Sequence, residues 1–478
     1  TNIIHVPPGF TFGVATASYQ VEGGWNASGK GESIWDHFTH THPELIADHS
    51  NGDIACDSYH LWREDVGIIK DLGVNYYRFS LSWPRLLPTG FTNVINENGV
   101  EYYNNLINEL LKNEIQPMVT LYHWDLPQTL QDLGGWTNPD LAQYFEDYSS
   151  VAFKLFGDRV KKWITINEPY SICEDTYGNG NGAPHIKSPG IGDYLCGRTL
   201  ILAHARAYRI YDKIYRKSQG GQVGITIDSI WAEPNSNATE DVEAAEREME
   251  IGLGWWANPI FSKEGDYPSV MKERIARNSR LENFTESRLP PFSKSEIKFI
   301  QGSADFFGLN HYHTWLISNY EYPVSDQPSY VKDKGTKGRQ DPNWKPSPQI
   351  VPWGLRKLLN WIKKKYNNPL VYITENGIGD NTGTLQDNER VLFLRVFLKA
   401  LFEAVTEDDC NVKLYTFWSI MDNMEWSSGY TIKFGLYKVD FSSPNRTRTP
   451  KASAKFYKNV IKNRYLNLEE DNLEVVLV

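Results

Sequence analysis

Several residue types and patterns are scarce in this chain, and each scarcity argues against a class of protein. Only four of its 478 residues are cysteines, which have no metal-ligand spacing and are too few for a disulfide-rich scaffold. No stretch approaches the roughly 18 uninterrupted apolar residues of a transmembrane helix. No linker divides the chain. We therefore expect neither a cysteine-bound metal, nor a membrane-spanning protein, nor a string of small domains.

Basic residues are also in deficit. Lys and Arg number 49 against 59 Asp and Glu, which gives a net charge of −10 at pH 7. Binding to a phosphate backbone needs clustered Lys and Arg, so nucleic acid is not an expected partner. An uncharged or cationic small ligand fits this charge better.

The start of the chain and its glycosylation tripeptides indicate whether the protein is secreted. The chain begins without Met or an apolar signal core, so we expect a mature product whose targeting segment has been removed. Asn-X-Ser/Thr tripeptides begin at Asn26, Asn237, Asn283 and Asn445. Their polar surroundings predict a secreted, extracellular glycoprotein. Cys173 and Cys196 flank one loop and could pair, although free buried thiols are the expectation.

Aromatic residues, by contrast, are abundant, with 16 Trp and 27 Tyr. Most are expected to fill a large core, but flat aromatic faces also stack on sugar rings. The chain alternates β-favouring runs with amphipathic helical stretches. The expected strands are 10–19, 74–81, 115–123, 160–167, 222–228, 305–312, 370–375 and 412–418. The expected helices are 57–72, 101–112, 139–156, 195–216, 244–256, 353–366 and 388–406.

This alternation predicts one (β/α)8 TIM barrel over residues 1–478, with a doubly wound sheet as the alternative. Connections from helix to strand are short. Those from strand to helix are long, namely 21–55, 124–138, 168–194, 313–352 and 419–448. Strand-to-helix loops build the active site of such barrels. We expect a short mobile tail at about 466–478.

Two of the expected strands end in a carboxylate at that face. Residues 160–167 lead into Glu168, and residues 371–374 lead into Glu375, which precedes an Asn-Gly turn pair. Two carboxylates across a barrel mouth can cleave an acetal, because one protonates the leaving oxygen while the other supports the oxocarbenium-like carbon. Either motif alone could be a polar strand end or a common turn. Their occurrence at corresponding strand ends favours catalysis.

Nearly the entire chain resembles glycoside hydrolase family 1, the retaining β-glucosidases and β-galactosidases. The segments that match the motifs of this family are 10–23, 77–80, 122–127, 165–169 (Thr-Ile-Asn-Glu-Pro), 373–377 (Ile-Thr-Glu-Asn-Gly) and 418–430. The resemblance implies hydrolysis through a covalent glycosyl-enzyme, with Glu168 as acid/base and Glu375 as nucleophile. It implies no cofactor and no metal.

The resemblance also implies supporting roles. Arg78 would lower the pKa of Glu375 as a nearby fixed cation, and Asn310 and Tyr312 would lie beside that nucleophile. The negative charge of Glu375 would raise the pKa of Glu168 until the glycosyl-enzyme forms. Without the resemblance, Asn310 and Tyr312 could simply close a strand end.

Sugar contacts follow from the same resemblance. The implied set is Gln20, His123, Asn167, Glu425 and Trp426 for the glycone hydroxyls, Trp418 beneath the sugar ring, and Trp344 for the aglycone. His123 alone would be read as a core histidine, and the loop around Trp344 could equally be plain solvated surface. Two departures from the family pattern, Met424 and His311, leave the preference among glucose, galactose and fucose open.

The sequence thus predicts a retaining exo-β-glycosidase that removes terminal β-D-glucosyl residues, and also galactosyl or fucosyl residues, from O-glycosides or short oligosaccharides. Glu425 would repel a 6-phosphate, so non-phosphorylated substrates are expected. One alternative is a myrosinase-like β-thioglucosidase, although the plant enzymes of that kind replace the acid/base Glu by Gln. Another is a catalytically silent glycan-binding homologue, which typically loses one of the two Glu residues. The sequence leaves open whether the chain forms a homodimer.

Overall fold

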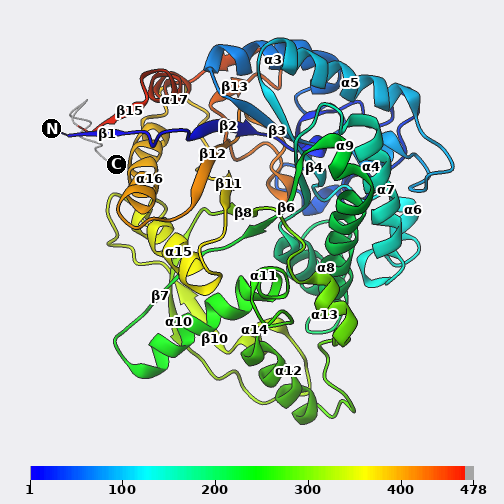
Figure 1. Ribbon diagram of the computed structural model, residues 1–478, viewed down its shortest axis with the longest axis vertical. Coiled ribbons are helices and arrows are strands. Elements are labelled where there is room, and N and C mark those ends of the chain that lie inside the picture. The colour runs from blue at the N-terminus through cyan, green and yellow to red at the C-terminus, as the bar shows by residue number, and fades with distance from the viewer. Residues whose placement is uncertain (1, 469–478) are drawn as a thin grey trace.

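Eight parallel strands form a closed barrel at the centre of the computed structural model, which describes residues 2–468 (Figure 1). Their order around the barrel is β11-β12-β2-β3-β4-β5-β6-β8. They are β2 (Thr11–Ala15), β3 (Tyr76–Ser80), β4 (Gln116–Tyr122), β5 (Lys162–Asn167), β6 (Gln222–Asp228), β8 (Phe307–Asn310), β11 (Val371–Glu375) and β12 (Val412–Trp418). Each expected strand is present, and the (β/α)8 prediction is confirmed.

Helices surround the barrel on its outside (Figure 1). The long ones that return the chain from one barrel strand to the next are α3 (Ser58–Leu72), α5 (Glu97–Lys112), α7 (Leu141–Phe156), α8 (Gly192–Ile210), α10 (Thr239–Gly252), α15 (Pro352–Lys365) and α16 (Asn388–Thr406), and α17 (Ala452–Asn463) follows the last strand. The sequence prediction lacks α17. Its buried apolar residues, Ala454, Tyr457, Val460 and Ile461, nevertheless have helical spacing.

Two expected helices are interrupted. The helix expected at 195–216 ends as α8 at Ile210 and continues through the π-helical turn η5 (Tyr211–Tyr215) into α9 (Arg216–Gln219). The helix expected at 244–256 divides into α10 and α11 (Gly254–Phe261). The remaining elements between β6 and β8 are β7 (Trp231–Pro234), α12 (Ser269–Leu281) and α13 (Lys294–Ile300).

The long strand-to-helix loops carry short elements of their own. These are α1 (Ser18–Val21), α2 (Ile34–Thr41), α4 (Trp83–Leu86), α6 (Gln128–Gln131), η4 (Ser171–Gly178), β9 (Thr314–Asn319), α14 (Tyr330–Lys334), β10 (Thr336–Arg339), β13 (Tyr437–Val439) and β14 (Arg448–Pro450). β7, β9 and β10 form a small sheet beside the barrel. The elaboration therefore lies on the face that the sequence predicts.

Large side chains fill one half of the barrel interior. Six buried side chains, mostly from the barrel strands, form a separate cluster there: Tyr76, Met118, Ile164, Phe306, Tyr372 and Leu414. Burying a large apolar side chain contributes about 1.5–3 kcal/mol, so this layer supports the barrel strongly. It fills the half near the strand starts and leaves the strand ends to polar side chains.

The two described ends of the chain lie together. β1 (Ile3–His5) pairs antiparallel with β15 (Tyr465–Asn467), at the left of Figure 1. β15 thus includes the first residues of the tail expected at about 466–478, and residues 469–478 lie outside the described residues. Within the part of the chain that is described, none of the helices has the length and apolar character needed to cross a membrane.

Cysteine pairing corrects one expectation. Cys173 and Cys196 form a disulfide, with Cα atoms 5.4 Å apart, because η4 packs against α8. The expectation of free thiols is therefore wrong for these two residues. Cys56 and Cys410 are free and buried.

Candidate active site

Glu375 ends β11 and is buried at the barrel mouth. Arg78 donates from Nη1 to its Oε2 at 2.8 Å, and the Tyr312 hydroxyl donates to its Oε1 at 2.6 Å. Burial raises the pKa of Glu375 above its ordinary value, whereas Arg78 and Tyr312 act in the opposite direction. Arg78 thus acts in the predicted direction, but burial is the larger effect.

Arg78 is fully buried and held by each of its nitrogens. Nε donates to Thr120 Oγ1 at 3.0 Å, Nη1 donates to the Thr374 carbonyl at 2.9 Å, and Nη2 donates to Asn167 Oδ1 at 2.7 Å. A planar guanidinium held in this way cannot rotate, so its charge stays directed at Glu375. It also fixes the amide of Asn167.

Glu168 follows β5 directly and has a left-handed backbone with φ 56°. Its Oε2 accepts from Asn310 Nδ2 at 2.8 Å, and its Oε1 accepts from Ser171 Oγ at 2.9 Å. Burial, then Asp228, then Glu375 raise the pKa of Glu168 well above its ordinary value. Glu168 therefore holds a proton more tightly than an ordinary carboxyl does.

The strand order brings the two carboxylates to one mouth. β5 and β11 are separated by β6 and β8, and Asn310 ends the intervening β8. Asn310 Nδ2 also donates to Asn167 Oδ1 at 3.1 Å. A chain of hydrogen bonds thus runs from Glu375 through Arg78, Asn167 and Asn310 to Glu168.

Two predicted sugar contacts keep an unpaired polar atom. His123 Nε2 accepts from Asn167 Nδ2 at 3.1 Å, and burial and Arg78 lower the pKa of this imidazole well below its ordinary range. The ring is therefore neutral and carries its proton on Nδ1, which has no partner among the described residues. Gln20 Nε2 donates to Glu425 Oε2 at 3.3 Å, whereas Gln20 Oε1 is buried and unpaired. One donor and one acceptor are thus available to a ligand.

Aromatic rings surround His123. Its imidazole stacks near Trp418 and Trp426, with ring centroids 5.8 Å and 5.9 Å away. Trp344, in contrast, packs edge-on against Trp353 at 5.5 Å. The structure therefore groups Trp418 and Trp426 with the polar residues at the mouth, and the contact of Trp344 with an aglycone stays a prediction.

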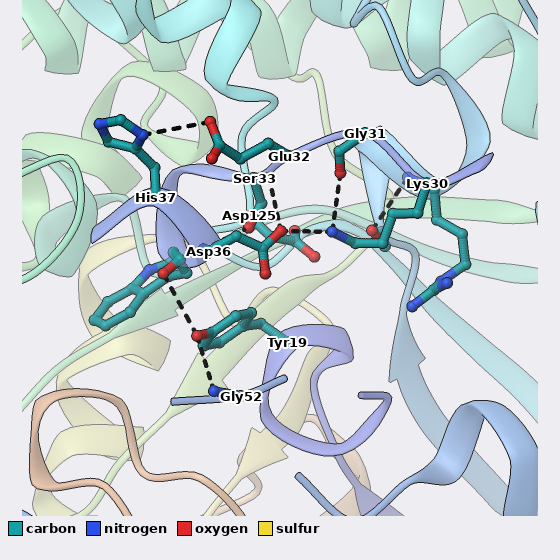
Figure 2. Close-up of polar contacts among 12 residues, drawn as sticks. Tyr19, Lys30, Gly31, Glu32, Ser33, Asp36, His37, Gly52 and Asp125 are labelled. Atoms are coloured by element: carbon teal, nitrogen blue, oxygen red, sulfur yellow. Dashed lines mark hydrogen bonds and ion pairs between the residues drawn. The ribbon is translucent and has the colours of Figure 1, made fainter. Parts of the chain in front are cut away.

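A buried polar cluster that includes Lys30, Asp36 and Asp125 lies in the loops after β2 and β4 (Figure 2). Lys30 Nζ contacts Asp36 Oδ2 at 2.6 Å, and Asp36 and Ser33 cap the start of α2 reciprocally. Asp125 accepts a hydrogen bond from Ser18, two residues before Gln20. Because Asp125 itself lies two residues after His123, the cluster couples the loops after β2 and β4 and holds both sugar-contact residues in place.

Two residues of the site are absent from the sequence prediction. Ser171 begins η4 and Asp228 ends β6, and the Ser171 hydroxyl contacts both Glu168 and Asp228. The signal for Asp228 was present, since the expected strand 222–228 ends in a carboxylate as the strands before Glu168 and Glu375 do. Ser171 has no comparable signal.

This fold and this pair of carboxylates define a glycosidase. Residues 3–466 match the family model described as glycosyl hydrolase family 1. The chain is 49% identical over 461 residues to Myrosinase 1 of Brevicoryne brassicae, covering 95% of this chain and 98% of that protein. It is 46% identical over 464 residues to the cytosolic beta-glucosidase of Homo sapiens, covering 96% and 98%.

A solved structure is also similar to this chain in fold and sequence. A mutant of the rice beta-glucosidase Os3BGlu6, in a covalent complex with Glc, matches with a TM-score of 0.89 and 40% identity, over 95% of this chain and 98% of that one. The chain belongs to glycosyl hydrolase family 1 and is a retaining glycoside hydrolase.

Proposed function

We propose that this chain is an exo-acting β-glucosidase that hydrolyses uncharged O-glycosides, with Glu375 as nucleophile and Glu168 as acid/base. The observation that carries the proposal is the contrast between the two carboxyl groups. Glu375 receives hydrogen bonds from Arg78 and Tyr312, which stabilise its ionised form. Glu168 lies among Asp228 and Glu375, which favour its protonated form.

The proposed reaction has two steps. In the first, a Glu375 carboxylate oxygen attacks the anomeric carbon while Glu168 gives its proton to the leaving oxygen, so that a glycosyl ester forms and the aglycone departs. The ester removes the negative charge of Glu375, which lowers the proton affinity of Glu168. In the second, Glu168 takes a proton from water as that water attacks the anomeric carbon and frees Glu375.

The glycone is proposed to lie among Gln20, His123, Asn167, Glu425 and Trp426, above Trp418. His123 Nδ1 supplies a donor and Gln20 Oε1 an acceptor, and both are otherwise unpaired. Burial raises the pKa of Glu425 to about 8. Sugar hydroxyls that donate to Glu425 would favour its carboxylate, which would exclude a 6-phosphate by charge. Galactosides and fucosides are proposed as secondary substrates.

Covalent trapping tests these roles. A 2-deoxy-2-fluoro-β-glucoside with a dinitrophenolate leaving group should inactivate the enzyme and add one fluoroglucosyl unit to the peptide containing Glu375. Glu375→Ala should take up no label, whereas Glu168→Gln should still be labelled because this leaving group needs no proton. A label on any other residue would contradict the assignment, and failure of the parent enzyme to hydrolyse any O-glucoside would contradict the substrate class.

The second candidate is a β-thioglucosidase, favoured by the 49% identity to Myrosinase 1. A thiolate leaves without protonation, so this activity needs no acid with the properties of Glu168. The decisive comparison is kcat/KM for an O-glucoside and an S-glucoside with the same aglycone, in the parent and in Glu168→Gln. Turnover that favours the S-glucoside and survives Glu168→Gln would replace the O-glucosidase proposal.

We also propose that the protein is secreted. The four glycosylation tripeptides begin at exposed asparagines, and the Cys173–Cys196 disulfide suits an oxidising compartment. Expression of the full-length gene in its own cells, followed by enzymatic removal of N-glycans from the protein in the medium, tests this proposal. Retention of all activity inside the cell, with no change in mass, would contradict it.

A further inference from the structure

We infer that Asp228 is a positioning residue for the acid/base, and that Glu168 and Asp228 share one proton through the hydroxyl of Ser171. This inference rests on the proposed role of Glu168. It concerns the way in which the acid keeps its proton, and not which bond the enzyme cleaves.

The geometry of the hydroxyl carries the inference. Ser171 Oγ lies 2.9 Å from Glu168 Oε1 and 3.1 Å from Asp228 Oδ2. A serine hydroxyl has one proton, so it can donate to only one of these two oxygens. With both carboxylates ionised, the second oxygen would face the lone pairs of Ser171. With one proton added to the pair, the protonated carboxyl donates to Ser171 Oγ, and Ser171 donates to the other carboxylate, so that all three groups are satisfied.

The charges around Asp228 favour that added proton. Asp228 lines a cavity of about 100 Å³ together with Tyr170, Glu248 and Tyr330. Glu375 and Asp175 add negative charge from β11 and η4. Lys334, on α14, is paired with Glu248 at 2.8 Å.

No ion pair among residues 2–468 joins Asp228 to a Lys or Arg, and its Oδ1 is buried without a partner. Burial first, and then Glu375 and Asp175, raise the pKa of Asp228 to about 7. Two neighbouring carboxyls in such surroundings titrate together, and the last proton leaves the pair only at a high pH.

The shared proton has a consequence for each step of the reaction. Before attack, the charge of Glu375 already helps Glu168 to retain its proton. Once the glycosyl ester has formed, that charge is gone while the charge of Asp228 remains. When Glu168 has given its proton to the leaving oxygen, the Ser171 hydroxyl can turn to donate to the new carboxylate. Asp228 thus keeps Glu168 basic enough to take a proton from the attacking water.

The test is the pH dependence of kcat/KM for an alkyl β-glucoside, whose leaving group needs the acid. The carboxylates can be no further apart than about 6 Å, because they share contacts of 2.9 Å and 3.1 Å to one oxygen. At that separation an effective dielectric constant near 20 gives a shift of about two pH units for the loss of the Asp228 charge. The basic limb of Asp228→Asn should therefore move to lower pH by that amount.

Ser171→Ala separates proton sharing from a simple charge effect. If Ser171 merely donates to the Glu168 carboxylate, its loss destabilises the ionised form and moves the basic limb to higher pH. If it links the pair, its loss removes two hydrogen bonds of the singly protonated state and moves the limb to lower pH. Ser171→Thr keeps the hydroxyl and should restore the parent profile.

Asp175→Asn is the matched control, since it removes a carboxylate of η4 that has no hydrogen bond to Glu168 or Asp228. It should shift the limb less than Asp228→Asn does. An unchanged limb in Asp228→Asn, or a limb at higher pH in Ser171→Ala, would overturn the inference. Loss of O-glucoside turnover by the parent is a different failure, which concerns the proposed function alone. A dinitrophenyl glucoside, whose departure needs no acid, should show no corresponding shift of a basic limb in its kcat/KM profile in any of these variants.

Discussion

Replacing Arg78 with methionine removes a buried cation from Glu375 while keeping much of the side-chain volume. Arg78 Nη1 lies 2.8 Å from Glu375 Oε2, and both side chains are almost completely buried, at 0% and 5% exposure. With charge centres about 4 Å apart and an effective dielectric constant near 20, their attraction is about 4 kcal/mol. That energy corresponds to about three pKa units of Glu375.

The expected result follows from the sign of this interaction. Burial already raises the pKa of Glu375, and the loss of Arg78 raises it further, so the nucleophile stays protonated to a higher pH than in the parent. The acidic limb of kcat/KM should move to higher pH by about two to three units. At a pH below the acidic limb of the parent, the rate should fall by about 100- to 1000-fold. Arg78→Lys keeps the charge but loses the bond geometry, so it should shift the limb much less.

The assay uses a dinitrophenyl β-glucoside, because its leaving group does not need Glu168 and the acidic limb then reports Glu375 alone. Circular dichroism and urea unfolding establish that the variants are folded, which is necessary because removing one partner of a buried pair costs about 3–5 kcal/mol. If folded Arg78→Met showed the acidic limb of the parent, the electrostatic account of Glu375 would be refuted.

Three other predictions concern proton release, the disulfide and acid stability. Burial raises the pKa of Glu425 to about 8. Binding at pH 7 of a glucose-like inhibitor whose hydroxyls donate to Glu425 should therefore release up to about one proton from the enzyme. Calorimetry in two buffers measures this proton release, and Glu425→Gln should abolish it. The disulfide closes a separation of 23 residues, so replacing Cys173 and Cys196 by serine should lower the free energy of unfolding by about 3 kcal/mol in urea, and an unchanged midpoint would count against it. Burial lowers the pKa of His204 to about 3, below the value near 6.5 of an unfolded chain. The contribution of neutral His204 to the free energy of unfolding is therefore complete above about pH 6.5. It is lost as the pH falls toward 3, by at most about 1.4 kcal/mol per pH unit. Urea unfolding of His204→Gln at several pH values should show a smaller loss of stability over this range.

Local patterns in the sequence predict the barrel because each strand is short, apolar and flanked by turn signals. The same patterns place Glu168 and Glu375 at the ends of β5 and β11, since a carboxylate that closes an apolar run must lie where the strand meets solvent. The supporting role of Arg78 came from the family resemblance, because nothing in residues 77–80 alone says which carboxylate a buried arginine faces.

Contacts between distant segments were beyond sequence reasoning. The pairing of Cys173 with Cys196 depends on how η4 packs against α8. The bridge from Ser171 to Asp228 joins residues 57 positions apart through the direction of one side chain. Neither the hydroxyl nor the turn of η4 that aims it has a periodic signal, so tertiary packing decides both.

At Glu168 the left-handed backbone lowers stability, whereas the side chain is the proposed acid/base. A non-glycine residue in that conformation costs about 1–2 kcal/mol, and its φ of 56° is one that glycine adopts without strain. A directed-evolution campaign that selects for heat resistance alone should therefore enrich glycine or asparagine at this position and silence the enzyme. A campaign that also selects for turnover should keep the glutamate and gain stability at other positions. The residue found at position 168 would therefore show whether turnover was part of the selection.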